Sequence, residues 1–398
     1  MASEWKKLTL GDITDIVIDY RGKTPKKLGG DWSESGYRAL SAKNIKTGQI
    51  VHPDSIRFVD EDMYRKWMKD EIQRGDIIVT SEAPFGQIFF WDSDEKIVLS
   101  QRLFGVRIKS EYCPQFVYYY MTTDEFQGEM DGRATGTTVV GLRQPELMKC
   151  ELRCPDYETQ KKIAAILASI DAKIATNNKI NDNLYEMVNA FYASLFKNAN
   201  AEVTTVGSYA DRIYSGGTPS TANAAFWDGA YGWFSSGETR NRFVISTEKT
   251  ITQEGIDSSS TKLAVKHDIV MASAGQGFTR GQTSMLLLDT YVNQSVIVIH
   301  AEKQLLPYLY WNLANRYEEL RAISDSSSIR GSLTTKMISA FEIPKATDES
   351  IQAFSDFAWS IIPQIENNLL ENERLIGLRE ALLPRLMSGE IDASSIDI

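Results

Sequence analysis

The chain has 398 residues, 42% of them apolar, which is enough for two or three globular units with cores of their own. It contains no run of about 18 apolar residues, and its first residues, MASEWKKLTL, lack the apolar segment of a signal peptide, so neither a membrane span nor secretion is expected. The cysteines at positions 113, 150 and 154 have the spacing of neither a zinc site nor a disulfide framework. These features indicate a cytoplasmic protein without a structural metal.

The net charge of −10 argues at first against a nucleic-acid partner, but the charge is unevenly distributed. Residues 346–398 carry 3 basic and 10 acidic side chains, whereas residues 21–50 carry seven basic and only two acidic ones. DNA responds to the field on one face of a protein more than to the total charge. The 21–50 segment is therefore a candidate DNA contact, with an ordinary solvated loop as the alternative.

A short turn motif occurs twice along the chain. Residues 22–25 read Gly-Lys-Thr-Pro and residues 216–219 read Gly-Gly-Thr-Pro. Because Gly and Pro turn a chain easily, one such match carries little weight. Further matches follow in the same order and at a nearly constant offset, pairing 72–84 with 264–276, 99–108 with 292–300, Pro114 with Pro307, and 139–148 with 329–338. We therefore predict an internal duplication.

Each copy has the same internal plan. Runs rich in Ile, Val, Phe and Tyr predict short strands in the first copy at 76–80, 87–91, 97–99 and 104–108. The predicted fold class is α+β, with two similar mixed α/β domains related as a pseudo-twofold repeat and two long antiparallel helices as a coiled-coil-like spacer. The expected boundaries are a domain at 1–155, a helix at 156–200, a domain at 201–345, a helix at 346–390 and a tail at 391–398.

The two long helices are predicted from heptad spacing. The first covers about 157–197 and the second about 349–387, and Asn residues fall near the middle of each apolar seam. Pro363 lies inside the second and should kink or delay it. The residues expected to pair the helices are Ile163, Leu167, Ile170, Ile174, Leu184, Val188, Phe191, Leu195, Phe354, Ile361, Ile362, Leu369, Leu375, Ile376, Leu382 and Leu383.

The order of the parts predicts their use. The parts follow one another as domain, helix, domain, helix. In this order the apolar seams of the two helices can pair only if the helices run antiparallel. About 40 residues at 1.5 Å each give a rod on the order of 60 Å, which suits a ligand with two separated sites, such as two half-sites on DNA. The alternative is that these are two ordinary core helices.

No catalytic constellation is evident. The Gly-rich stretches lack the Lys placement of a phosphate loop, and the three histidines, His52, His267 and His300, are scattered without metal-ligand spacing. The tetrapeptide of amino-methyltransferases, Asn or Asp followed by two prolines and an aromatic residue, is also absent. We therefore expect a binding protein.

Several segments match one known family. They are WKKLTLGDI at the N-terminus, GKTP and GGTP, RGDIIVT and KHDIVMA, INDNLYEMVNAFYASLF at 180–196, and LREALLPRLMSGEID at 378–392. Over essentially its full length the chain resembles the specificity (S) subunit of type I restriction–modification enzymes. The resemblance implies two target-recognition domains, each reading one half of a bipartite sequence in double-stranded DNA, and helices that dock two methyltransferase subunits. It also implies restriction subunits as partners, with S-adenosylmethionine, ATP and Mg²⁺ bound on the partner subunits and none on this chain.

DNA contacts are expected from basic side chains and from nearby hydroxyl and amide groups on loops. In the first copy these are Lys23, Thr24, Lys26, Lys27, Arg38, Lys43, Asn44, Arg102, Arg133, Thr137 and Arg143. In the second copy they are Thr218, Arg240, Asn241, Arg242, Gln276, Thr279, Arg280, Ser328 and Arg330.

Three other functions stay open from the sequence. They are a specificity subunit of a related single-nuclease system that cuts on both sides of its site, a stand-alone nuclease or methyltransferase, and a scaffold that binds only proteins. Steeply salt-dependent DNA binding would separate the first reading from the scaffold. Because the chain is acidic overall, we expect it to bind DNA weakly without its partners.

Overall fold

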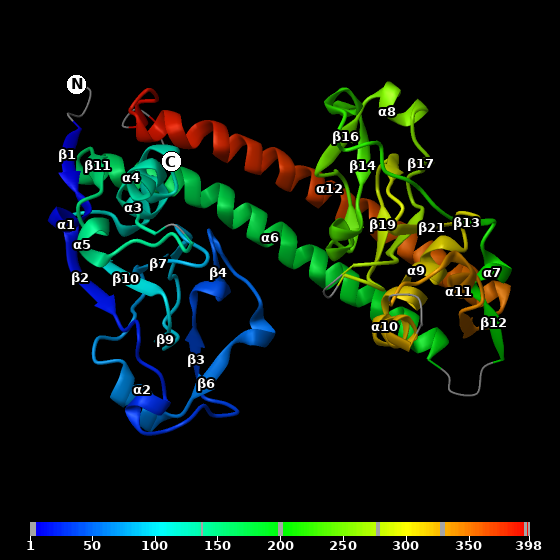
Figure 1. Cartoon of the computed structure of the whole chain (residues 1–398), viewed down its shortest axis with the longest axis horizontal. Helices are drawn as coiled ribbons and strands as arrows, with labels where there is room; N and C mark the ends of the chain where they lie inside the picture. The colour runs from blue at the N-terminus through cyan, green and yellow to red at the C-terminus, as the bar shows by residue number, and fades with distance from the viewer. Residues whose placement is uncertain are drawn as a thin grey trace. The chain divides into compact units, whose positions relative to one another are not determined.

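The computed structural model describes residues 5–136, 138–197, 202–275, 279–326, 331–393 and 396. The chain divides into two compact units, Met1–Lys173 with Leu375–Ile398 (unit 1) and Ile174–Arg374 (unit 2). Each unit combines small mixed sheets with helices, as Figure 1 shows, so the predicted α+β class is confirmed.

Unit 1 is built around a four-stranded antiparallel sheet. Its order is β2 (Thr14–Asp19), β10 (Leu103–Ile108), β7 (Ile77–Thr80) and β8 (Ile88–Phe90). A three-stranded sheet follows with the order β6 (Arg57–Val59), β3 (Tyr37–Leu40) and β9 (Val98–Leu99), in which β3 and β9 run parallel. The four strands predicted in this copy correspond to β7, β8, β9 and β10.

Smaller elements complete unit 1. Two strand pairs are β1 (Lys6–Thr9) with β11 (Glu151–Cys154) and β4 (Ile45–Lys46) with β5 (Gln49–Ile50). The short helices are α1 (Leu10–Ile13), η1 (Lys26–Leu28), η2 (Ala42–Asn44), η3 (Pro53–Ser55), α2 (Glu61–Trp67), α3 (Pro114–Met121), α4 (Asp124–Arg133) and α5 (Gln144–Leu147). Helix α3 begins with Pro at its first position, where no backbone N–H is required, and buries Phe116 and Tyr120 in the core.

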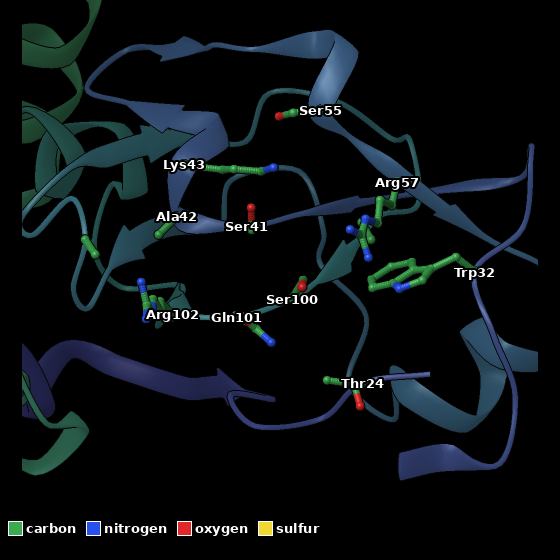
Figure 2. Close-up of a pocket in the computed structure, with 12 residues that line it drawn as sticks. Thr24, Trp32, Ser41, Ala42, Lys43, Ser55, Arg57, Ser100, Gln101 and Arg102 are labelled. Carbon is green, nitrogen blue, oxygen red and sulfur yellow. The ribbon is translucent and has the colours of Figure 1, made fainter. Parts of the chain in front are cut away.

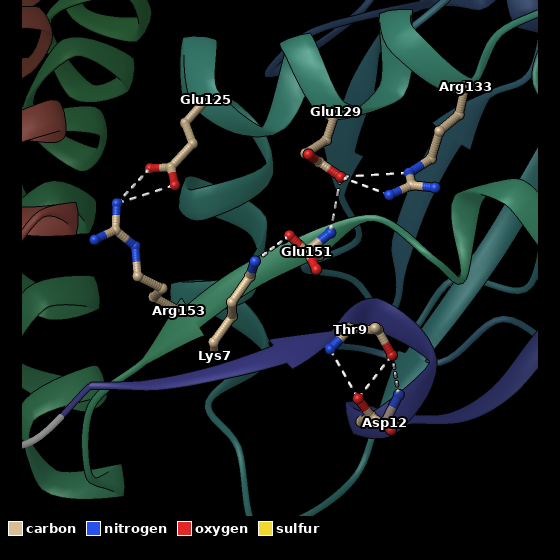
Figure 3. A network of polar contacts seen from close by, with 8 residues as sticks. All are labelled: Lys7, Thr9, Asp12, Glu125, Glu129, Arg133, Glu151 and Arg153. Atoms are coloured by element: carbon tan, nitrogen blue, oxygen red, sulfur yellow. Dashed lines mark hydrogen bonds and ion pairs between the residues drawn. The ribbon is translucent and has the colours of Figure 1, made fainter.

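A polar network fixes the strand pair β1–β11 of unit 1 (Figure 3). Lys7 pairs with Glu151 across the two strands at 2.5 Å, and Glu129 of α4 accepts hydrogen bonds from Arg133 and from the Glu151 backbone N–H. The hydrogen bond from Arg133 holds the pKa of Glu129 below its usual value. Arg133 therefore serves the scaffold of unit 1 in this structure.

Unit 2 repeats the strand order of unit 1. Its larger sheet runs β13 (Arg212–Ser215), β21 (Val296–His300), β18 (Ile269–Ala272), β19 (Thr283–Leu286) and β15 (Phe243–Val244). Its second sheet runs β16 (Lys249–Ile251), β14 (Trp227–Phe234), β20 (Thr290–Val292) and β17 (Lys262–Ala264), with β14 and β20 parallel as β3 and β9 are. The two sheets of unit 2 each have one strand more than the corresponding sheets of unit 1, namely β15 and β17, and the shared strand order confirms the predicted duplication.

The remaining elements of unit 2 follow the same plan. Strand β12 (Val203–Thr205) pairs with β22 (Glu342–Pro344). The helices are α7 (Val206–Tyr209), η4 (Ala224–Phe226), η5 (Ser236–Arg240), α8 (Gln253–Asp257), α9 (Leu306–Ala314), α10 (Tyr317–Ser326) and α11 (Thr335–Ser339).

One buried carboxylate is common to both units. Asp76, which is 1% exposed, accepts two hydrogen bonds from Arg107 and one from the backbone N–H three residues before it. Asp268 occupies the same place in unit 2, also accepts from the backbone N–H three residues before it, and lies 2.6 Å from Nδ1 of His300. The carboxylate therefore fixes the same turn in both units, while the side chain that pairs with it differs.

The two long helices are α6 (Tyr157–Phe196) and α12 (Asp348–Met387). Both match the predicted extents closely. Helix α12 continues through Pro363 without ending, so the expected delay of the helix at this residue is wrong. Within the described part of the chain, no helix is long and apolar enough to cross a membrane.

Inside unit 2 the two helices pair through a ladder of asparagines. The Asn177 amide donates to Asn372 at 2.9 Å and to Glu371 at 2.8 Å, and Asn368 donates to Asn181 at 2.8 Å. Residue numbers rise along one helix as they fall along the other, so this pair is antiparallel as predicted. Inside unit 1 the same helices are joined by an ion pair between Arg379 and Asp171 at 2.7 Å.

The residues predicted to pair the helices fall into three groups. Seven are buried, namely Ile163, Leu167, Ile170, Val188, Phe354, Ile361 and Ile362. Seven are half-buried, namely Ile174, Leu184, Phe191, Leu369, Leu375, Leu382 and Leu383. Leu195 and Ile376 are exposed. Most buried members also belong to the core of their own unit, so the helices are both paired and part of the domain cores.

Candidate nucleic-acid interface

A recess of about 400 Å³ opens on unit 1 where its three-stranded sheet ends (Figure 2). Strand β3 is central in that sheet, so the chain leaving β3, the chain leaving β9 and the start of β6 meet at one place. The first Gly-x-Thr-Pro turn closes the remaining side through Thr24. Twelve residues line the recess: Thr24, Trp32, Ala39, Ser41, Ala42, Lys43, Ser55, Arg57, Ala83, Ser100, Gln101 and Arg102.

The lining of the recess is cationic. It contains Lys43, Arg57 and Arg102 together with four hydroxyl groups and one amide, and none of the twelve described residues carries a carboxylate. In a chain with net charge −10, this composition favours an anionic ligand. Figure 2 shows the Lys43 side chain extending into the recess.

The three cations of the recess are held in different ways. The Arg57 guanidinium lies over the Trp32 ring, 5.1 Å from its centroid, which orients the guanidinium without neutralising it. Arg102 pairs with Glu82 at 3.0 Å, but both side chains are more than a third exposed, so this ion pair is weak. No ion-pair partner of Lys43 is found in the described part of the chain.

The loop that carries Lys43 is fixed by its own polar residues. The Ser41 backbone N–H and hydroxyl both donate to the Asn44 side chain, and the Asn44 amide donates to the backbone carbonyls of Val51 and His52 and to the Ser55 hydroxyl. This is a capping box around η2. Lys43 is therefore presented from a backbone of defined shape.

Unit 2 has the same loop device. Ser235 donates from its backbone N–H and its hydroxyl to Glu238, which forms a capping box around η5. The Lys249 ammonium lies over the Trp227 ring, 5.6 Å from its centroid, as the Arg57 guanidinium lies over the Trp32 ring. The turn threonine, Thr218, is hydrogen-bonded to Gln294. Each unit therefore places a capped loop, a Trp–cation pair and a Gly-x-Thr-Pro turn on the same strand framework.

Comparison with known proteins agrees with this architecture. Residues 2–186 match the family model of the type I restriction modification DNA specificity domain. The chain is 23% identical over 98% of its length to the whole of the HindI type I restriction enzyme specificity subunit of Haemophilus influenzae. It is 28% identical over 46% of its length, and 43% of the relative, to the MjaVIII type I restriction enzyme specificity subunit of Methanocaldococcus jannaschii. By these comparisons the chain is similar to type I restriction enzyme specificity subunits.

A solved structure shares the fold of this chain. The type I restriction-modification S subunit from M. genitalium superposes with a TM-score of 0.61 at 14% identity, covering 97% of this chain and 96% of that one. At this identity the likeness concerns the fold alone.

The structure places the DNA-contact residues predicted in unit 1 in several environments. Thr24, Lys43 and Arg102 line the recess. Lys26 of η1 and Arg143, which directly precedes α5, are exposed. The others contact unit 1 itself: Lys23 donates to the Trp67 carbonyl, Lys27 to the Gly22 carbonyl, Arg38 pairs with Glu95, and Arg133 pairs with Glu129.

Asn44 requires a correction. Its side chain is 1% exposed, and all of its hydrogen-bonding groups are used inside the loop that it caps. It cannot reach a base edge while the loop keeps this shape. We therefore assign Asn44 a structural role in place of the predicted DNA contact.

In unit 2 the predicted residues are also divided. Asn241 is exposed, Thr279 is half-buried, and Thr218 is bonded to Gln294. The three arginines lie in ion pairs, Arg240 with Glu248, Arg242 with Asp182 of α6, and Arg280 with Asp325. Arg242 also lies over the Tyr185 ring at 4.1 Å, which makes it part of the unit 2 scaffold. Thr137 of unit 1 and Gln276, Ser328 and Arg330 of unit 2 lie outside the described residues.

Several residues of the site are absent from the sequence prediction. They are Trp32, Arg57 and Gln101 in unit 1 and Trp227 and Lys249 in unit 2. One signal was available, because each Gly-x-Thr-Pro turn is followed by a Trp, seven residues after Pro25 and eight after Pro219. The cations that stack on these rings come from β6 and β16, and only the sheet register reveals that neighbourhood.

Proposed function

We propose that this chain is the DNA sequence-specificity subunit of a type I restriction–modification complex. Unit 1 and unit 2 each read one half of a bipartite target in double-stranded DNA. The observation that carries the proposal is the recess of unit 1, which gathers three cations and no carboxylate on a chain that is acidic overall. The similarity to the two relatives named above supports it, since both are type I restriction enzyme specificity subunits.

The recess offers two kinds of DNA contact. Lys43, Arg57 and Arg102 suit the phosphates, which fix orientation on the duplex without reading sequence. Gln101, Ser41 and Ser100 add donors and acceptors of the kind that discriminate base edges. The capping box keeps the loop backbone in place, so the side chains reach the duplex with little ordering cost.

The long helices supply the surface for partner subunits in this proposal. Exposed apolar side chains remain on both helices, namely Ile180, Met187 and Leu195 on α6 and Ile376 and Leu378 on α12. A partner subunit docked along the helices would bury these side chains. Two methyltransferase subunits would dock there, and restriction subunits would join the complex. The chain itself is non-catalytic, with S-adenosylmethionine, ATP and Mg²⁺ bound by those partners.

Genome-wide mapping of methylated adenines tests this function. Cells with and without the gene for this chain are compared, and one bipartite motif should lose its methylation when the chain is absent. Reintroducing the wild-type chain should restore that motif. An unchanged methylation pattern in both strains would contradict the proposal and favour the protein-binding scaffold.

A second assay addresses the stand-alone enzyme. The purified full chain is incubated with duplex DNA and radiolabelled S-adenosylmethionine, and no label should enter the DNA until methyltransferase subunits are added. Label transfer by the chain alone would show that it is itself a methyltransferase.

A further inference from the structure

One position in the two units differs in a way that changes the site. Ala39 of β3 lies opposite Arg57 of β6, and Trp233 of β14 lies opposite Lys249 of β16. Ala39 is also opposite Val98 in the parallel pair, as Trp233 is opposite Tyr291. The two residues therefore occupy one structural position, and unit 2 has an indole where unit 1 has a methyl group.

The Trp233 indole takes up the space that is open in unit 1. Its Nε1 donates to the Gly217 carbonyl of the second Gly-x-Thr-Pro turn at 3.2 Å, and its ring meets Trp227 edge-on at 5.0 Å. Trp233 is only 5% exposed. In unit 1 the Ala39 methyl group and Thr24 of the first turn both line the open recess. The larger side chain therefore spans the distance from strand to turn.

The charges differ in the same direction. Counting from the paired capping boxes, Lys43 corresponds to Gly237. Counting from the paired strand ends Leu99 and Val292, Arg102 corresponds to Ser295. Unit 2 thus retains one of the three cations, Lys249, which stands at the position of Arg57.

We propose that the recess of unit 1 binds a phosphodiester group of the DNA backbone, and that the residue at position 39 or 233 decides whether a unit has such a site. This rests on the proposed function, because DNA is taken to be the ligand. Unit 1 then contributes more of the sequence-independent, salt-dependent affinity than unit 2, although both read sequence.

The chemistry of the recess suits a phosphate. A guanidinium stacked on an indole keeps its N–H groups free for the two non-bridging oxygens, as Arg57 on Trp32 does. The Lys43 ammonium adds a flexible second charge. Arg102 can exchange its exposed carboxylate partner, Glu82, for the phosphate. No acidic side chain within the lining would oppose the anion.

Salt-dependent binding of the full-length chain to a fluorescent duplex of mixed sequence tests the proposal. Each phosphate contact adds about 0.9 to the slope of log affinity against log salt concentration. Ala39→Trp should lower that slope by about one, because the indole displaces the single phosphate from all three cations, and Lys43→Gln should lower it by up to the same amount. Lys66→Gln is the matched control, because Lys66 is exposed on α2 and lies outside the recess.

The outcomes separate the two proposals. Wild-type slopes for both Lys43→Gln and Ala39→Trp, with intact salt-dependent binding, would overturn the phosphate site and leave the function standing. Absence of any salt-dependent DNA binding by the wild-type chain, alone and with methyltransferase subunits, would overturn the function itself. If Ala39→Trp fails to fold, as judged by circular dichroism, the surface change Lys43→Gln decides the question alone.

Discussion

The two units of the chain share one strand order, but they differ at the centre of the smaller sheet. In unit 1 a methyl group at Ala39 leaves a cationic recess, whereas in unit 2 the indole of Trp233 fills the same place. The backbone around both positions is alike, with the same strand pairing and the same kind of capped loop. A duplicated scaffold can thus present a hollow or a filled surface through the volume of one side chain.

The largest expected effect concerns the filled position. Trp233→Ala should lower the free energy of unfolding of unit 2 by about 3–5 kcal/mol, because it leaves a cavity and frees the Gly217 carbonyl. Urea unfolding followed by circular dichroism measures it. Trp32→Ala, which removes a half-buried indole from unit 1, should cost less than half as much. Equal losses would contradict the idea that Trp233 fills space that is open in unit 1.

The second prediction compares the buried carboxylates. Asp76→Asn should cost about 2 kcal/mol, because Arg107 then loses its charged hydrogen-bond acceptor. Asp268→Asn should cost less, because burial already raises the pKa of Asp268 and disfavours its charged form. Urea titrations of both variants at pH 7 provide the measurement. A larger loss for the unit 2 variant would reverse this part of the comparison.

The third prediction concerns the helix segments in each unit. Asn177→Ala should destabilise unit 2 by about 1–2 kcal/mol, because Asn177 is fully buried and its amide bonds to Asn372 are lost. Arg379→Gln in unit 1 removes a partly exposed ion pair and should cost under about 1 kcal/mol. Thermal unfolding of the two variants gives the ranking, and the opposite order would show that the ladder is dispensable.

The smallest expected effect is a pH dependence confined to unit 2. Since burial raises the pKa of Asp268 in the folded state, its protonated form stabilises unit 2 below a pH of about 4, the unfolded value. That contribution is lost as the pH rises through the raised pKa. The stability advantage of the wild-type chain over Asp268→Asn should therefore shrink between pH 4 and pH 7. An advantage that grows over this range in urea titrations would contradict the assignment.

The long helices and the duplication could be predicted from the sequence because both leave periodic signals. Heptad spacing located α6 within one residue at its C-terminal end. Pro363 is predicted to kink or delay α12, but the helix continues through it. The neighbouring residues Ile361 and Ile362 are buried, and this packing holds the helix in place around the exposed proline.

The residues of the candidate interface are harder to predict from the sequence, because the register of the strands decides which side chains lie next to one another. Arg57 follows Trp32 by 25 positions, and nothing in that spacing indicates that the two side chains stack. Asparagine is a residue type that contacts bases, so Asn44 is a reasonable candidate from the sequence. An asparagine that caps a loop cannot be distinguished from a base-contacting one by sequence alone. The sequence predicts a DNA contact for Arg242 from its charge and the polar loop around it, whereas the fold gives that charge a partner, Asp182.

The capping boxes have a consequence for retargeting the protein. Each closes its loop through the first and last residues, Ser41 with Asn44 and Ser235 with Glu238. Of the two positions between them in unit 1, Ala42 is buried in the core and Lys43 is exposed. A library randomised at Lys43 alone should therefore yield folded proteins with altered DNA preferences, which makes this one position the place to begin engineering.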